Sequence, residues 1–126
     1  MILVEVSIGE ILDKLTILAI KKQKISDPQK LVHIEKEYDI LEEKSRQYLN
    51  SEEVKNVFEE LIEVNSKLWV IEDDLRDLES QKRFDEEFVE KARLVYKTND
   101  HRFVLKNKIN LLTDSGVQEQ KGYKSY

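Results

Sequence analysis

The 126-residue sequence contains no cysteine, one proline and three glycines. The absence of cysteine excludes disulfide bonds, thiolate metal ligands and cysteine nucleophiles. Because proline and glycine interrupt helices and form tight turns, their scarcity favours long helices over a protein rich in β-turns. At this length we expect a single helical domain that spans residues 1–126.

Long hydrophobic runs are also missing. The longest nearly apolar stretch, residues 15–20, is far shorter than the about 20 residues that a membrane-spanning helix needs. Glu5 interrupts the apolar start of the chain, so we expect no signal peptide. A net charge of −5 argues against nucleic-acid binding through bulk electrostatics. We therefore expect a cytoplasmic protein that binds neither membranes nor nucleic acid.

Capping signals divide the chain into four expected helices and predict an all-α, antiparallel bundle. Each helix is expected to begin after a residue whose side-chain oxygen can accept a hydrogen bond from the first turn: Ser7, Asp27, Ser51 and Asp85. The helices then cover about residues 8–26, 28–50, 52–81 and 86 to a stop near Gly116. Ser7 and Glu10 form a reciprocal capping box. The short turn at 82–85 makes the third and fourth helices a long antiparallel hairpin.

Two features indicate a homo-oligomer. Residues 2–6 alternate apolar residues around Glu5 and predict a short β-strand, which is unstable without a partner. Its partner is either the tail at 117–123 or the same strand of another subunit. The third and fourth helices, of about 30 residues each, would be about 45 Å long, whereas a compact monomer of this size has a gyration radius of roughly 14 Å. Helices of that length leave apolar surface for another subunit to cover.

The third helix carries two stripes. A heptad seam consists of Leu61, Val64, Leu68, Ile71, Leu75 and Leu78. A mixed stripe beside it consists of Ile62, Asn65, Trp69, Glu72, Asp73 and Arg76. The only tryptophan therefore shares a helix face with an amide, two carboxylates and a guanidinium.

The fourth helix places a second polar set level with the mixed stripe: Arg93, Tyr96, Asn99, Asp100, Arg102 and Lys106. We call the two sets together, without Ile62, the polar belt. Residues 98–101 are poor helix formers, which predicts either a kink re-capped by Asp100 or a helix maintained by tertiary contacts.

Two interpretations of the polar belt stay open. In the structural one, paired charges set the helix register, for example Glu72 with Arg93 or Arg102 across the hairpin. In the other, the polar belt forms a ligand pocket. The anion-holding residues are then Arg76, Arg93, Arg102 and Lys106; the remaining lining residues are Asn65, Trp69, Asp73, Tyr96 and Asn99. Glu72 or Asp100 would serve as catalytic base or metal ligand.

The carboxylate spacing of Glu60 and Glu63, followed by Glu72, Asp73 and Asp74, is similar to the Mg²⁺-holding clusters of all-α nucleotide pyrophosphohydrolases. Those enzymes place the carboxylates on two antiparallel helices, whereas all of these lie on one. We therefore expect no metal or other cofactor, and Mg²⁺ belongs only to the alternative function given below.

Four blocks of sequence carry a resemblance to a known family. They are EVSIGEILDKLTIL at 5–18, LWVIEDDLR at 68–76, VYKTNDHR at 95–102 and KGYKSY at 121–126. Together they resemble an uncharacterised family of small bacterial and phage proteins, described only as a domain of unknown function. The resemblance implies a complete chain with a native tail, and it implies no activity.

The function that these observations favour is that of a non-catalytic, homo-oligomeric helical interaction protein. The alternative is a small all-α enzyme or binder of a phosphorylated or carboxylated metabolite, similar to a nucleotide pyrophosphohydrolase and dependent on Mg²⁺.

Overall fold

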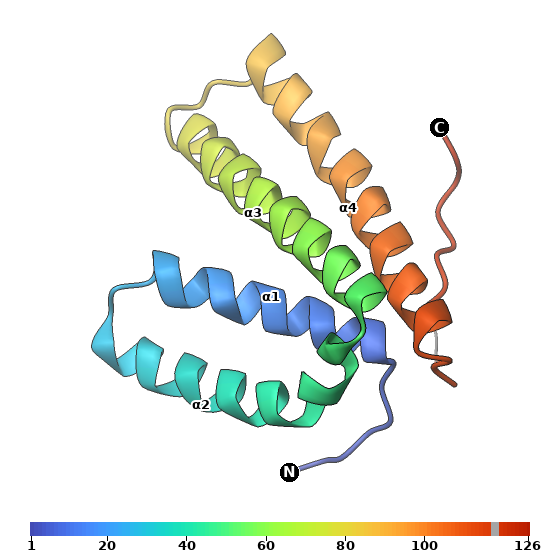
Figure 1. Cartoon of the computed structure of the whole chain (residues 1–126). Coiled ribbons are helices and arrows are strands. Elements are labelled where there is room, and N and C mark those ends of the chain that lie inside the picture. Colours follow the sequence, from blue (N-terminus) through green and yellow to red (C-terminus); the bar gives the residue numbers. More distant parts are fainter. Residues whose placement is uncertain (117–118) are drawn as a thin grey trace.

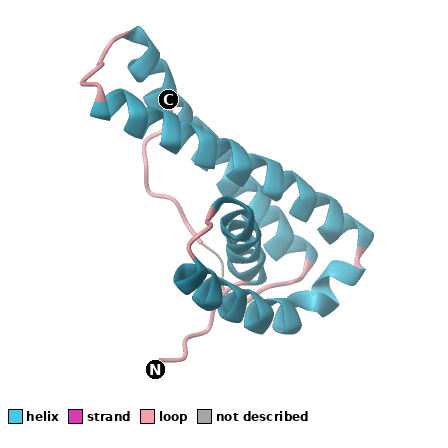
Figure 2. Ribbon diagram, turned by 90° about the vertical axis from the view of Figure 1, so that its left-hand side faces the viewer, coloured by secondary structure: helices cyan, strands magenta, loops and turns pink. Residues whose placement is uncertain are grey.

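The computed structural model describes residues 1–116 and 119–126. In these residues the chain forms α1 (Ile8–Lys24), α2 (Pro28–Ser45), a short 3-10 helix (Arg46–Asn50), α3 (Glu52–Ser80) and α4 (Glu86–Leu112). Helices α3 and α4 form a long antiparallel hairpin, α1 packs across one half of it, and α2 packs on α1 (Figure 1). Viewed from the side, α1 lies between the hairpin and α2 (Figure 2). The predicted all-α fold with a long hairpin of the last two helices is confirmed.

The N-terminus of each helix carries the capping residue that the sequence predicts. The side-chain oxygens of Ser7, Asp27, Ser51 and Asp85 each accept a backbone N–H from the first turn. Only one half of the capping box at Ser7 is present, because the Glu10 carboxylate lies 2.8 Å from the Lys106 ammonium instead of turning back to its own helix.

The long helices end on residues with left-handed backbone. Lys82 has φ 55° and Asp114 has φ 52°. Beyond the end of α3, the Arg83 N–H donates to the Leu78 carbonyl at 2.9 Å. Beyond the end of α4, the Ser115 N–H donates to the Asn110 carbonyl, also at 2.9 Å. This is the Schellman arrangement, in which glycine is the usual left-handed residue. The predicted stop of α4 near Gly116 is wrong, because the helix ends earlier, at Leu112.

The expected single helix at 28–50 is also interrupted. Helix α2 ends at Ser45, and the chain continues as the 3-10 helix. The buried Ser45 hydroxyl donates to the Leu41 carbonyl at 2.7 Å. A hydroxyl that bonds back one turn often bends a helix, which fits the change of helix type at this point.

The predicted strand at residues 2–6 is not present, and no other described residue forms a strand either. Ile2 and Leu3 are each 87% exposed. Of the proposed partner segment 117–123, residues 117 and 118 lie outside the described residues. The rest follows α4, where Lys106 binds Glu119 and Asp100 binds Lys121, and none of it forms a strand.

Packing between the helices is concentrated at one end of the hairpin. The buried cluster there consists of Leu12, Leu15, Val54, Val57, Leu61, Val64, Leu105 and Ile109. Helix α4 passes through residues 98–101 without a break, so the predicted re-capping by Asp100 is wrong and the chain follows the alternative of an uninterrupted helix. None of the described helices is apolar over a length that would cross a bilayer.

Candidate functional site

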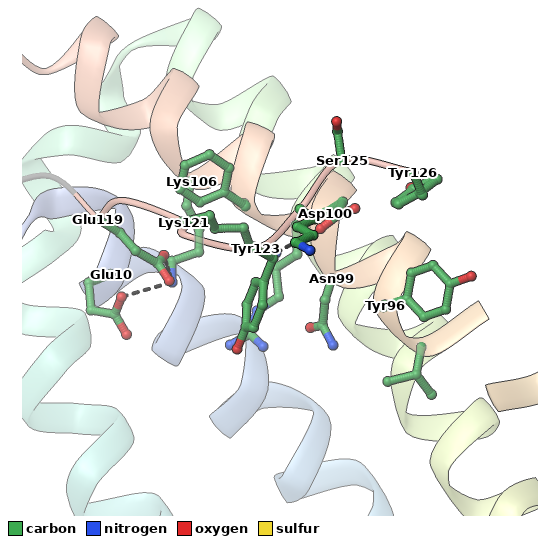
Figure 3. A pocket seen from close by; sticks show the side chains of 14 residues that line it. Glu10, Tyr96, Asn99, Asp100, Lys106, Glu119, Lys121, Tyr123, Ser125 and Tyr126 are labelled. Atoms are coloured by element: carbon green, nitrogen blue, oxygen red, sulfur yellow. Dashed lines mark hydrogen bonds and ion pairs between the residues drawn. The ribbon is translucent and has the colours of Figure 1, made fainter. Parts of the chain in front are cut away.

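The C-terminal residues 119–126, which we call the tail, run back along α4. The Lys121 ammonium lies 2.9 Å from Asp100 Oδ1, and the Tyr126 ring packs edge-on against Tyr96 with 5.3 Å between centroids (Figure 3). The Lys121 hydrogen bond, with a smaller contribution from the Tyr126 hydroxyl, lowers the pKa of Asp100 even though desolvation opposes it. These contacts anchor one end of the tail to the middle of α4.

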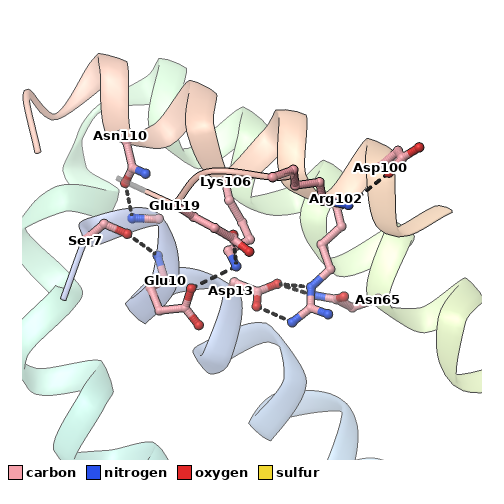
Figure 4. A network of polar contacts seen from close by, with 11 residues as sticks. Ser7, Glu10, Asp13, Asn65, Asp100, Arg102, Lys106, Asn110 and Glu119 are labelled. Carbon is pink, nitrogen blue, oxygen red and sulfur yellow. Dashed lines mark hydrogen bonds and ion pairs between the residues drawn. The ribbon is translucent and has the colours of Figure 1, made fainter. Parts of the chain in front are cut away.

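The other end of the tail meets Lys106, whose side chain is 9% exposed. Its ammonium lies 2.8 Å from Glu10 Oε2 on α1 and 2.7 Å from Glu119 Oε2 on the tail (Figure 4). Burial disfavours the charge on Lys106, but the hydrogen bonds to Glu10 and Glu119 outweigh that effect and raise its pKa. Lys106 thus joins α1, α4 and the tail through one cation.

A buried polar cluster lies where α1, α3 and α4 meet, and Asp13 is its centre at 1% exposure. The Arg102 guanidinium donates to both Asp13 oxygens, at 2.9 and 2.5 Å. The Asn65 amide donates to Asp13 Oδ1 at 2.9 Å and to the Thr16 hydroxyl at 2.7 Å (Figure 4). The Asp13 hydrogen bond raises the pKa of Arg102. No buried side-chain nitrogen or oxygen in the described part of the chain lacks a partner, so this cluster satisfies itself.

Helices α1 and α4 approach each other closely at Gly9. Its N–H donates to Asn110 Oδ1 at 2.7 Å. A Cβ at this position would lie 2.7 Å from that oxygen and would overlap the Lys106 carbonyl oxygen. The absence of a side chain at Gly9 therefore sets the distance between α1 and α4, and with it the reach of Glu10 and Asp13 toward α4.

Two cavities adjoin these clusters. The tail cavity, of about 830 Å³, lies between α4 and the tail (Figure 3). Its α4 lining includes five residues of the predicted polar belt: Tyr96, Asn99, Asp100, Arg102 and Lys106. The Trp69 cavity, of about 500 Å³, lies beside α1 and α3, and it is lined by six: Asn65, Trp69, Glu72, Asp73, Arg76 and Arg102. Both cavities fall in the volume range of small-molecule sites, about 300–1,000 Å³.

The structure thus divides the polar belt into two groups that share Arg102. Arg93 lines neither cavity and is exposed. The pairing of Glu72 with Arg93 or Arg102 across the hairpin is wrong, because Glu72 pairs with Arg76 one turn away on its own helix, at 2.6 Å. Ligand binding by the polar belt stays a prediction.

Sequence reasoning missed Asp13 as the partner of Arg102 and Asn65, and it missed Glu119 as a partner of Lys106. The available signal at Asp13 was a carboxylate on a helix that is apolar on most sides, since a buried charge requires a paired and hydrogen-bonded partner. Glu119 carried no comparable signal, because the tail has no helical periodicity that would place it.

No group of three or more carboxylate, imidazole or thiol side chains is arranged as a metal site within the part of the chain that the structure describes. In particular, the carboxylates at 60, 63, 72 and 73 do not converge there. The Mg²⁺-dependent alternative therefore receives no support from the geometry.

Comparison with known proteins yields one match. No curated protein and no solved structure matches the chain. A family model described as "Family of unknown function (DUF6165)" matches residues 2–126. This match covers all four blocks of sequence that carry the resemblance, from the first capping box to the tail. The chain therefore belongs to this family of unknown function.

Proposed function

We propose that this protein is a non-catalytic, homo-oligomeric interaction protein whose partner is a second copy of the same chain. The observation that carries the proposal is an exposed stripe along α4. It consists of Leu94, Lys97, His101, Val104, Lys108 and Leu111, all exposed and spaced three or four residues apart. We call it the outer α4 stripe. The core and the tail cover the other faces of α4 in this region.

A second stripe on α3 is complementary to it in charge. The outer α3 stripe consists of Glu52, Asn56, Glu59, Glu63, Lys67, Val70 and Asp77, all exposed, with four carboxylates against the single cation of Lys67. On each helix the stripe lies roughly opposite the residues that contact α1, such as Asn65 and Lys106. The hairpin therefore has an exposed face, basic and apolar along α4 and predominantly acidic along α3.

Two such faces fit each other. A two-fold axis parallel to the helices places the outer α4 stripe of one copy on the outer α3 stripe of the other, and the same contact occurs twice. The product is an antiparallel four-helix arrangement. The apolar residues at 1–4, which are exposed in the single chain, add further surface for association. A non-catalytic role is supported by the two candidate bases, because Glu72 and Asp100 both form ion pairs.

Light scattering coupled to gel filtration tests the proposal. At micromolar concentration we expect a mass about twice that of the 15.0 kDa chain. Replacing Val104 and Leu111 by Glu places acidic groups opposite the acidic α3 stripe and should give the monomer mass. Val32→Glu is the matched control, because Val32 is exposed on α2 and lies in neither stripe. A wild-type mass near 15.0 kDa contradicts the proposal.

A second candidate function is binding of a phosphorylated or carboxylated metabolite. It is favoured by the observation that ten of the eleven predicted residues, all except Arg93, line one of the two cavities. We also propose that the protein is cytoplasmic and has no nucleic-acid partner. The net charge of −5 supports the absence of a nucleic-acid partner.

A further inference from the structure

The tail bridges α4 rather than packing closely against it. Glu119 anchors it at Lys106, and Lys121 and Tyr126 anchor it at Asp100 and Tyr96. Between α4 and the tail there remains a volume of about 830 Å³ (Figure 3). Closely packed protein segments leave few spaces larger than a water molecule, so the span of the tail is better suited to covering a ligand than to filling a groove.

Residues that line this volume carry hydrogen-bond donors without a partner among the described residues. Arg102, which lines both cavities, binds Asp13 through Nε and one terminal nitrogen, and its other terminal nitrogen has no partner among the described residues. The Asn99 side-chain amide lines the cavity without a described hydrogen bond. Lys106 directs its ammonium toward the two carboxylates of Glu10 and Glu119, of which Glu119 belongs to the tail (Figure 4). An anionic group entering here would therefore meet donors on α4 and one displaceable carboxylate.

Aromatic side chains form the rest of the wall. Tyr96 and Phe103 on α4 and Tyr123 and Tyr126 on the tail all line the tail cavity. Aromatic faces bind planar rings by offset or edge-on stacking, and the Tyr123 and Tyr126 side chains are mostly exposed. The wall thus provides surface for a ring beside the cationic end.

We propose that the tail cavity binds a small molecule that joins a planar ring to one carboxylate or phosphate group. The anion replaces Glu119 at Lys106, and the ring lies among the aromatic side chains of α4 and the tail. This inference rests on the second candidate function, metabolite binding, and is independent of self-association through the outer stripes.

Calorimetric titration of the full chain separates the two halves of the ligand. The probes are adenosine monophosphate and 4-hydroxybenzoate, which carry both a ring and an anion, and adenosine and inorganic phosphate, which carry one each. We expect at least one of the first two to bind at least tenfold more tightly than adenosine and phosphate. The better of the two identifies phosphate or carboxylate as the anion. Absence of binding by both at millimolar concentration overturns the proposal.

Two substitutions should act in opposite directions. Lys106→Met retains the aliphatic stem and removes the cation, so binding should weaken at least tenfold. Glu119→Gln removes the competing carboxylate, so binding should tighten. Lys67→Met is the control, because Lys67 is exposed on α3 and forms no described ion pair. If Glu119→Gln leaves affinity unchanged or lowers it, the anion does not replace the tail and the proposal is wrong.

The single tryptophan locates the ligand. Trp69 lines the other cavity and not the tail cavity, so its fluorescence should stay unchanged on binding. A fluorescence change that saturates with the calorimetric affinity places the ligand in the Trp69 cavity and overturns the assignment. Light scattering on the same samples reports self-association separately, so failure of either proposal can be recognised without the other.

Discussion

Asp13 shows how one buried carboxylate determines which helix faces meet. It lies on α1 and is almost fully buried, so its charge requires compensation. Arg102 supplies the counter-charge and Asn65 supplies a further hydrogen bond, from α4 and α3 respectively. Any rotation of α1 that removed Asp13 from these partners would leave a buried charge unpaired. The cluster therefore sets the rotational register of α1 against the hairpin.

Asp13→Asn should be strongly destabilising. The substitution keeps the shape but leaves Arg102 without its counter-ion, which for a buried pair costs about 3–5 kcal/mol. Because the Arg102 side chain is 27% exposed, we expect a loss near the lower end, about 3 kcal/mol, in urea denaturation. Glu72→Gln is the control. Its carboxylate pairs with Arg76 at the surface, so its effect should stay below about 1 kcal/mol. Equal effects of the two substitutions would contradict this account.

The difference between prediction and structure at this scale has a physical cause. Asn65 and Arg102 could be selected from the sequence, because polar residues beside an apolar seam stand out. Their partner could not be selected, because the long hairpin directs attention to pairs between its own two helices. Counting residues outward from the turn of the hairpin places Glu72 level with residues of α4, but this count does not tell which way each side chain points. Among the described residues, an ion pair that does cross the hairpin joins Asp74 and Lys91 at 2.9 Å.

At the scale of elements, Gly9 determines how closely α1 can approach α4. Gly9→Ala should destabilise the protein, although alanine is the better helix former by about 1 kcal/mol. The added methyl would overlap the Lys106 carbonyl oxygen, which is backbone and cannot rotate away. We expect a net loss on the order of 3 kcal/mol, the size of overpacking effects, measured by urea denaturation. Gly122→Ala, where nothing lies near the added Cβ, should leave stability nearly unchanged.

The tail should detach from α4 in acid. Because the folded-state pKa of Asp100 is lowered, the ion pair with Lys121 contributes fully above the ordinary aspartate pKa of about 3.9. That contribution is lost as the pH falls through the lower, folded-state value. Nuclear magnetic resonance of tail amides should therefore show release only below about pH 4.

Asp100→Asn provides the matched test, because it should weaken tail anchoring already at neutral pH. The exposed Asp39 on α2 serves as control, and Asp39→Asn should leave the tail resonances unaffected. If the tail stays ordered in Asp100→Asn and through the acid range, the other contacts, Lys106 with Glu119 and Tyr126 with Tyr96, are sufficient to hold it and the prediction is wrong.

The first residue of each α-helix could be predicted, because capping side chains and apolar spacing are local signals, whereas the ends of α2 and α4 were predicted several residues too late. The strand at residues 2–6 could not be excluded in this way, since alternation of apolar residues indicates a strand only where a partner edge exists. The path of the tail was likewise inaccessible. It depends on Lys121 meeting Asp100 and on Glu119 meeting Lys106, and neither pair has a local sequence signature.

At the scale of the whole molecule, the two halves of the α3–α4 hairpin differ in packing. The end near residues 54–64 and 105–109 is covered by α1, whereas the end near residues 71–95 projects beyond it (Figure 1). Few side chains of the projecting half are fully buried; Ile71 and Leu78 are the buried hydrophobic ones among the described residues. The sequence predicted the hairpin and its length, but it did not contain the angle at which α1 crosses.

Hydrogen exchange should reveal this difference. Local opening has a lower free energy where few apolar contacts must be broken. Amides near Val57, Leu61 and Ile109 should therefore exchange more slowly than amides of residues 71–78 and 88–95, as measured by mass spectrometry of peptic fragments. Association into the dimer proposed above would reduce this difference in exchange rate and would make it depend on protein concentration. The comparison should therefore be made in the Val104→Glu, Leu111→Glu variant as well. Uniform protection along the hairpin in that variant would contradict the prediction.

The contact between Asp13 and Arg102 also bears on the order in which the chain folds during its synthesis. The two residues are 89 positions apart, so α1 leaves the ribosome long before its counter-charge has been translated. Closing a loop of that length costs roughly 2–3 kcal/mol more than closing the turn between α3 and α4. We therefore expect the hairpin to form as soon as α4 emerges and α1 to dock last, with Asp13 in water until then. A ribosome stalled before residue 102 would carry a chain whose first helix has no place to bury its carboxylate.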